Sequence, residues 1–172
     1  MQKTAFIWDL DGTLLDSYEA ILSGIEETFA QFSIPYDKEQ VREFILKFSV
    51  QDLLEQVAEE RTLDAEVLNQ VRAQRLAEKN AQVVLMPGAR EVLSWADQVG
   101  IQQFVYTHKG DNAFTILRDL GLESYFKEIL TSQSVFARKP SPEAANYLLD
   151  KYQLNLDNTY YIGDRTLDVE FA

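Results

Sequence analysis

The sequence predicts an α/β protein: a parallel β-sheet flanked by helices, with a small all-helical domain inserted after the first strand. Three observations predict this class. An apolar run at residues 4–8 stops at an acidic turn, residues 17–83 show only helical periodicity, and strands alternate with helices from residue 87 onward. A block as long as 17–83 exceeds an ordinary crossover between neighbouring strands. We therefore expect a core domain of residues 1–16 and 84–172 and a helical domain of residues 17–83.

The first half of the chain predicts one strand and a series of helices. Residues 4–8 are continuously apolar, which is typical of a strand buried on both faces of a parallel sheet. The apolar residues of the next segment fall on one helical face: Ile21, Leu22, Ile25 and Phe29. Asp37, with Gln40 three residues later, predicts the start of a helix that runs to about Lys47. Two stretches without Gly or Pro predict helices at about 50–60 and 64–80.

The second half predicts alternating helices and strands. Gly100 ends a first helix, Gly121 ends a second, and Ser141 followed by Pro142 begins a third. The expected elements are a helix at 89–99, a strand at 101–106, a helix at 111–121, a strand at 129–131, a helix at 141–151 and a strand at 159–162. Right-handed βαβ units join such strands into a parallel sheet. We expect both tryptophans, Trp8 and Trp95, to lie in the hydrophobic core.

Composition excludes several classes of function. The 172 residues contain no cysteine, which rules out disulfides, thiolate nucleophiles and Cys-ligated zinc. The single histidine, His108, leaves no second histidine for a multi-His metal site. A net charge of −12 disfavours nucleic-acid binding through a basic patch. There is no apolar run of about 18 residues and no signal-peptide pattern at the N-terminus, so we expect a cytoplasmic protein that does not enter the membrane.

Polar side chains gather where the predicted strands end, which is where open parallel sheets bind ligands. They are Asp9 and Asp11, then Thr107, His108 and Lys109, then Asp164 and Asp168, with Lys139 before a helix. Four converging carboxylates repel one another unless some are protonated or a hard divalent cation lies among them. Oxygen ligands favour magnesium. Lys139 and the Thr107 hydroxyl would then receive an anionic substrate, an arrangement suited to phosphoryl transfer.

These residues resemble the motifs of the haloacid dehalogenase-like (HAD) superfamily. The run from Asp9 to Ser17, DLDGTLLDS, is similar to the first motif, DxDGTLxDS. Thr107 resembles the second motif, Lys139 with Pro140 the third, and Gly163-Asp164 with Asp168 the fourth. The resemblance implies a Rossmann-like three-layer core, with residues 17–83 as a type 1 helical cap that closes over the substrate. It points to the phosphoglycolate phosphatase and β-phosphoglucomutase-like subfamily, and we expect hinges near 16–17 and 83–86, where core and cap meet.

The resemblance also implies catalytic roles for four residues. Asp9 would be the nucleophile and form an aspartyl-phosphate. Asp11 would protonate the leaving oxygen and later activate water. Thr107 would donate a hydrogen bond to the phosphoryl group, and Lys139 would neutralise charge on that group and on Asp9. Thr107 and Lys139 therefore count as substrate-binding residues too.

A magnesium site and further substrate contacts follow from the same resemblance. Asp9, the backbone carbonyl of Asp11, and Asp164 would bind Mg²⁺, with Asp168 acting through water or through Lys139. Thr13 and His108 complete the expected substrate-binding set. For His108 an alternative stays open, in which it caps the helix that follows.

The resulting prediction is a magnesium-dependent phosphatase that acts on a small phosphorylated metabolite. An aspartate at position 11 favours phosphate chemistry, because the founding dehalogenases of the superfamily lack it. A sugar-phosphate mutase is an alternative, although the cap histidine and arginine of such mutases have no counterpart near Ala20 or Gln51. A catalytically silent binding or regulatory protein is a second alternative, opposed by the intact Asp9 and Asp11.

Overall fold

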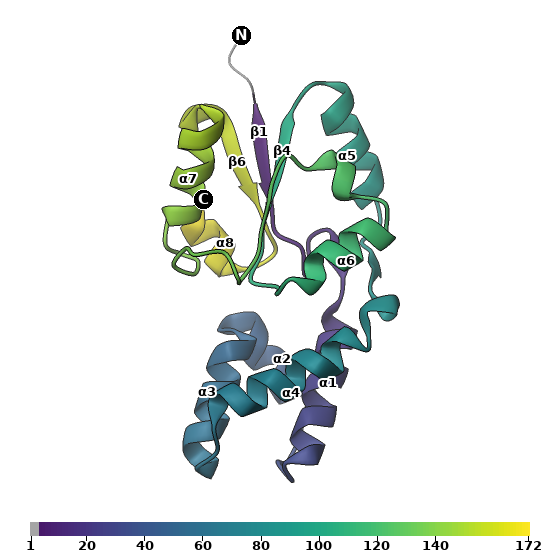
Figure 1. Cartoon of the computed structure of the whole chain (residues 1–172), viewed down its shortest axis with the longest axis vertical. Helices are drawn as coiled ribbons and strands as arrows, with labels where there is room; N and C mark the ends of the chain where they lie inside the picture. Colours follow the sequence, from purple (N-terminus) through teal and green to yellow (C-terminus); the bar gives the residue numbers. More distant parts are fainter. Residues whose placement is uncertain (1–3) are drawn as a thin grey trace. The chain divides into compact units, whose positions relative to one another are not determined.

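The computed structural model describes residues 4–172, which divide into two compact units (Figure 1). The first unit combines the segment that ends at Asp16 with Val84–Ala172, and the second is Ser17–Val83. The first is an α/β core and the second is entirely helical. The predicted fold class, a parallel sheet with helices and an inserted helical domain, is confirmed.

The core contains a four-stranded parallel sheet in the order β5-β4-β1-β6. The strands are β1 (Ala5–Trp8), β4 (Gln102–Tyr106), β5 (Ile129–Leu130) and β6 (Thr159–Ile162). Trp8, the last residue of β1, is level with Val105 of β4 and with Ile162 of β6. Because all four strands are parallel and these three are in register, their carboxyl ends meet at one edge of the sheet.

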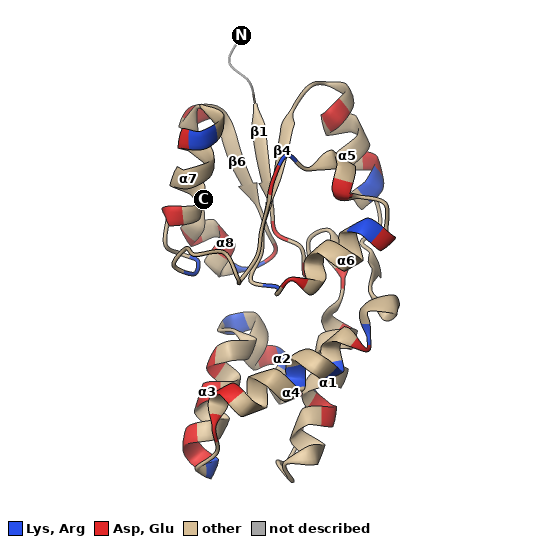
Figure 2. Ribbon diagram, viewed as in Figure 1, with Lys and Arg blue, Asp and Glu red and all other residues tan. Residues whose placement is uncertain are grey.

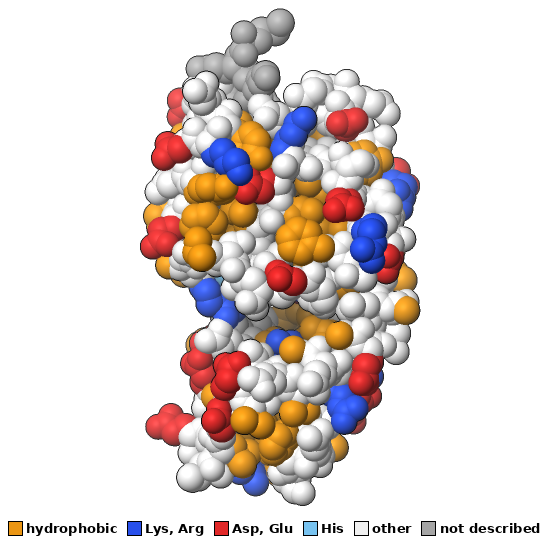
Figure 3. Space-filling model, in the orientation of Figure 1, with side chains coloured by type: hydrophobic (Ala, Val, Ile, Leu, Met, Phe, Trp, Pro, Cys, Tyr) orange, Lys and Arg blue, Asp and Glu red, His pale blue; other side chains and the backbone are white. Residues whose placement is uncertain are grey.

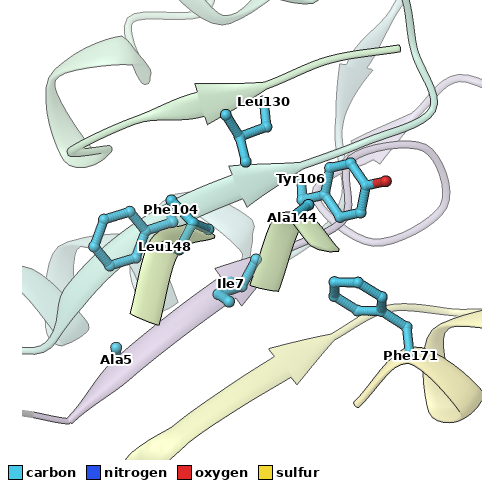
Figure 4. Close-up of a cluster of buried hydrophobic side chains, with 8 residues drawn as sticks. All are labelled: Ala5, Ile7, Phe104, Tyr106, Leu130, Ala144, Leu148 and Phe171. Atoms are coloured by element: carbon cyan, nitrogen blue, oxygen red, sulfur yellow. The ribbon is translucent and has the colours of Figure 1, made fainter. Parts of the chain in front are cut away.

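Helices cover both faces of this sheet (Figure 1). They are α5 (Ala89–Gln98) and α6 (Asn112–Asp119) on one side, and α7 (Glu143–Tyr152) and α8 (Thr166–Phe171) on the other, with 3-10 turns at Glu123–Tyr125 and Leu156–Asn158. The α7 and α8 side buries a cluster that includes Ile7, Phe104 and Leu148 (Figure 4). On the other side, Trp8 donates to Gln103, which donates in turn to the Leu93 carbonyl of α5. The two faces of the strands therefore pack against different helices, which gives three layers.

The helical unit consists of four helices and a short 3-10 turn. They are α1 (Tyr18–Gln31), α2 (Lys38–Lys47), α3 (Val50–Arg61), α4 (Ala65–Ala77) and Asn80–Gln82. Ile25, Phe29, Leu54 and Leu68 are buried in this unit, as expected for amphipathic helices that pack on one another. The predicted cap of α2 is confirmed, because the Asp37 carboxylate accepts a hydrogen bond from the backbone N–H of Gln40 at 2.9 Å.

A second, two-stranded antiparallel sheet was not predicted. It pairs β2 (Leu15–Asp16) with β3 (Val84–Leu85), and the N–H of Met86 donates to the Leu14 carbonyl. Strands of two residues are too short to show an alternating pattern. The pairing lies at the two segments where we expected hinges, and hinge motion there stays a prediction.

Two local expectations were wrong. Trp8 is buried, but Trp95 is 51% exposed. The inward face of α5 is set by Ala89, Leu93 and Ala96, and a residue two positions after Leu93 lies on the opposite side of the helix. In addition, α7 begins after Pro142 rather than after Ser141.

The net charge of −12 comes from acidic residues that both units carry. Figure 2 shows acidic residues on helices of both units, and on the face drawn in Figure 3 they lie among hydrophobic and uncharged side chains. Within residues 4–172, no helix combines the length and hydrophobicity needed to cross a bilayer.

Candidate active site

Asp9 and Thr107 are buried directly beyond the ends of β1 and β4. The backbone N–H of Asp9 donates to the Ile162 carbonyl at 2.8 Å, and that of Thr107 donates to the Leu130 carbonyl at 3.0 Å. Each residue thus continues the hydrogen-bond pattern of its strand by one step. The rigid sheet therefore fixes the backbone position of both residues.

Lys139 is fully buried and has three oxygen partners. Its Nζ lies 2.6 Å from Asp168 Oδ1, 2.6 Å from Tyr161 Oη and 3.3 Å from Asp9 Oδ1. A lysine ammonium has three protons, so these contacts satisfy its donor capacity. The Tyr161 hydroxyl in turn donates to the Tyr106 carbonyl at 2.9 Å. The predicted contact between Lys139 and Asp9 is present, and Tyr161 is a partner that the sequence did not reveal.

Burial controls the ionisation of Asp9. Removal from water raises its pKa to about 6, an effect that outweighs the opposing attraction of Lys139. The negative charges of Asp168 and Asp11 contribute to this rise, and the value of about 6 includes them. Asp9 is thus costly to ionise in the protein alone, and a bound cation would offset that cost.

The carboxylates of Asp9, Asp164 and Asp168 converge. One oxygen from each lies within 4.8 Å of the others, so the three side chains fit a single metal ion. A donor set made only of oxygen suits a hard divalent cation such as Mg²⁺. The residues present therefore fit the magnesium site that the motifs imply.

Both carboxylate oxygens of Asp168 accept hydrogen bonds from other groups of the protein. Its Oδ1 accepts from Lys139 and its Oδ2 accepts from the backbone N–H of Arg165 at 3.1 Å, which caps helix α8. Both oxygens thus already have protein partners, which favours an action of Asp168 through Lys139. A Cβ atom at Gly163 would overlap the Asp168 side chain, so the glycine of this motif is required for the packing.

Asp11 contacts a different lysine from the one that contacts Asp9 and Asp168. Its Oδ1 is 2.9 Å from Nζ of Lys109, whose side chain is only 2% exposed. From the sequence, Lys109 was one of the polar residues at the strand ends, and together with His108 it was expected either to contact substrate or to cap the next helix. The backbone carbonyl of Asp11 was predicted to be a ligand of Mg²⁺, and that assignment stays a prediction.

Thr13 and His108 have contrasting surroundings. The Thr13 hydroxyl is the one buried side-chain polar atom without a hydrogen-bond partner within residues 4–172. His108 Nε2 instead accepts from the backbone N–H of Lys139 at 3.0 Å, and burial with nearby Arg138 lowers its pKa to about 2. Helix α6 has no side-chain cap, so the alternative role of His108 as its cap is wrong. Contact of Thr13 and His108 with substrate stays a prediction.

Comparisons with known proteins agree with this geometry. A phosphoglycolate phosphatase of Pseudomonas syringae pv. tomato is 26% identical over 96% of the chain, which spans 64% of that relative's length. A hydrolase from Streptococcus pneumoniae TIGR4 is 33% identical, with 99% of this chain and 88% of that chain covered and a TM-score of 0.65. A hydrolase from Pseudomonas syringae is 28% identical, with 98% and 80% covered and a TM-score of 0.80.

The sequence profile of one family extends over nearly the whole chain. It matches residues 6–172 and therefore includes every residue of the site described above. The parallel sheet, the helical unit inserted after the first strand and the aspartates at the strand ends agree with that match. The chain belongs to the haloacid dehalogenase-like hydrolase family.

Proposed function

We propose that this protein is a magnesium-dependent phosphatase that hydrolyses a small phosphomonoester through an aspartyl-phosphate on Asp9. The observation that carries the proposal is the buried Asp9 carboxylate, which lies 3.3 Å from Lys139 and within the three-aspartate cluster. The names of the curated relatives support 2-phosphoglycolate as the first ester to test. A cytoplasmic location remains a prediction, and the net charge of −12 argues against a nucleic-acid partner.

The first half-reaction transfers the phosphoryl group to Asp9. A carboxylate oxygen of Asp9 forms a bond to phosphorus while the bond from phosphorus to the ester oxygen breaks. The departing oxygen keeps the bonding electrons and takes a proton from Asp11. Lys139 reduces the repulsion between the Asp9 carboxylate and the anionic phosphoryl group.

The second half-reaction frees Asp9. Asp11 accepts a proton from a water molecule, whose oxygen attacks the phosphorus, and the bond between phosphorus and Asp9 breaks. Inorganic phosphate leaves, and Asp9 is again a carboxylate. Thr107 Oγ accepts a hydrogen bond from the N–H of Lys109 at 3.1 Å, which orients the hydroxyl to donate its own proton to a phosphoryl oxygen.

Asp9, Asp164 and the backbone carbonyl of Asp11 would hold Mg²⁺, and Asp168 would act through Lys139. When bound, the ion supplies positive charge that stabilises the transferring phosphoryl group. We further propose that the helical unit, Ser17–Val83, is the cap that selects the ester. Exchange of that unit for the corresponding unit of a relative is expected to change which ester is hydrolysed fastest.

The test is release of inorganic phosphate from a panel of small phosphomonoesters, including 2-phosphoglycolate. Each ester is assayed with Mg²⁺, with EDTA, and with the variant Asp9→Asn. Asp157→Asn, which makes the same change at an exposed aspartate of the core, is the control. We expect turnover that EDTA and Asp9→Asn abolish and Asp157→Asn preserves. Turnover that survives in Asp9→Asn, or no turnover from folded wild-type protein, would overturn the proposal.

A further inference from the structure

We infer that Lys109 is a positioning residue that holds the Asp11 carboxylate in place for both proton transfers of the proposed reaction. The inference rests on the proposed function. It concerns a lysine that lies outside the four motifs and, within residues 4–172, forms no ion pair with any member of the three-aspartate cluster.

The backbone of Lys109 is fixed at both of its polar groups. Its N–H donates to Thr107 Oγ at 3.1 Å, and its carbonyl accepts from the N–H of Ser132 at 2.9 Å. The backbone N–H of Thr107 in turn donates a hydrogen bond to the carbonyl of Leu130 in the neighbouring strand. The side chain therefore extends from a rigid point at the end of β4, and its Nζ has little freedom of position.

The two partners of the ion pair between Lys109 and Asp11 differ in burial. The Lys109 side chain is 2% exposed, whereas the Asp11 side chain is 21% exposed. A buried ammonium needs an anionic partner, because an uncompensated charge in the protein interior is strongly unfavourable. The fixed, buried cation thus restrains the more exposed carboxylate.

The two buried lysines of the site have separate partners. Lys139 contacts Asp9 and Asp168, and Lys109 contacts Asp11. This separation lets Asp11 be oriented independently of the nucleophile. Because Lys109 engages Oδ1 of Asp11, it fixes the direction in which the carboxylate faces during both proton transfers. Lys109 keeps its own protons throughout, and misplacement of Asp11 by about 1 Å is enough to cost about 100-fold in rate.

Leaving-group dependence tests this role. Lys109→Met removes the ammonium but keeps a long apolar side chain, and Lys109→Arg keeps the charge. Lys79→Met is the matched control, because Lys79 is a buried lysine paired with Glu27 at 2.6 Å in the helical unit. The readout is kcat/KM, which reports the steps up to departure of the leaving group, for 2-phosphoglycolate and for p-nitrophenyl phosphate.

We expect Lys109→Met to lower kcat/KM for the alkyl ester, 2-phosphoglycolate, by about 100-fold, since assisted proton transfer contributes about 10²–10⁴-fold to the rate. The leaving group of the aryl ester, p-nitrophenyl phosphate, needs no proton. For this ester we expect kcat/KM to fall by no more than about threefold on the same principle. Lys109→Arg should restore part of the loss, and Lys79→Met should lower neither value. Equal losses for both esters, or no loss for either, would overturn the inference.

A crystal structure of each Lys109 variant decides the question without any turnover. We expect the Asp11 carboxylate to leave its wild-type position in Lys109→Met and to stay closer to it in Lys109→Arg. Asp11 in its wild-type place in Lys109→Met would overturn the positioning role even if the variant were inactive. If wild-type protein hydrolyses no ester, the proposed function fails, while this structural comparison still decides whether Lys109 positions Asp11.

Discussion

Replacement of Asp9 by asparagine is expected to abolish turnover and also to stabilise the metal-free protein above pH 6. The folded protein raises the pKa of Asp9 from 3.8 to about 6, chiefly through burial. The folded state therefore binds this proton more tightly than the unfolded state does. Stability linked to Asp9 is fully present below pH 3.8 and is lost as the pH rises through about 6. An uncharged asparagine is not subject to that loss.

The magnitude follows from the size of the shift. Each pKa unit corresponds to about 1.4 kcal/mol, so the shift of about two units corresponds to about 3 kcal/mol in the free energy of unfolding. The difference between Asp9→Asn and wild type should be smallest near pH 4, grow between pH 4 and pH 6, and stay constant above pH 6. Asparagine is nearly isosteric with the protonated carboxyl group, so the pH dependence of the difference is the informative quantity.

Urea denaturation in EDTA from pH 4 to pH 8 measures this difference. Asp157→Asn is the control for loss of a negative charge at an exposed position. A constant difference between Asp9→Asn and wild type over the whole range would refute the reasoning, as would a relative loss of stability in Asp9→Asn at high pH. Addition of Mg²⁺ should stabilise wild type more than the variant, since the variant lacks one anionic ligand.

Three further changes test the surroundings of the nucleophile. Tyr161→Phe keeps the ring packed on Phe171 but removes the hydrogen bond from Lys139. Urea denaturation should show that the free energy of unfolding falls by about 1.5–3 kcal/mol, and kcat should also fall. Unchanged values of both would contradict a role for the hydroxyl. Gly163→Ala places a Cβ against Asp168 and should lower both the denaturation midpoint and kcat, and wild-type behaviour would refute the predicted overlap. The pKa of His108 is lowered to about 2, so it stays neutral under assay conditions. His108→Asn should therefore change activity by the same factor at every pH, and a displaced limb of the pH–rate profile would contradict this.

The sequence predicted the part of the site that depends on strand order. Asp9, Thr107 and Asp164 each follow an apolar run, and parallel strands in register bring such residues to one edge of the sheet. Lys139 follows no strand, and its predicted place near Asp9 depended on the motif resemblance. Its contact with Asp9 is present in the structure at 3.3 Å.

The partners of these residues could not be predicted in the same way. Tyr161 appears in the sequence as one more aromatic residue of a strand, and only the three-dimensional arrangement shows that its hydroxyl lies 2.6 Å from Lys139. Lys109 is the third polar residue after a strand, a position where solvent exposure is common, yet its side chain is buried against Asp11. Neither contact has a periodic signal, because both depend on side-chain direction between segments far apart in the chain.

The charged side chains of the site leave an excess of negative charge, which favours a bound cation. Asp9, Asp11, Asp164 and Asp168 carry four negative charges when ionised, and the lysines paired with them, Lys109 and Lys139, carry two positive charges. The Arg165 guanidinium, whose charge also acts on Asp9, adds a third positive charge, so an excess of one negative charge remains for a bound cation to offset. Without that ion the raised pKa of Asp9 keeps part of the nucleophile protonated near pH 6, and a protonated carboxyl is a poor nucleophile. The same burial that destabilises metal-free Asp9 therefore makes its reactivity depend on the cation.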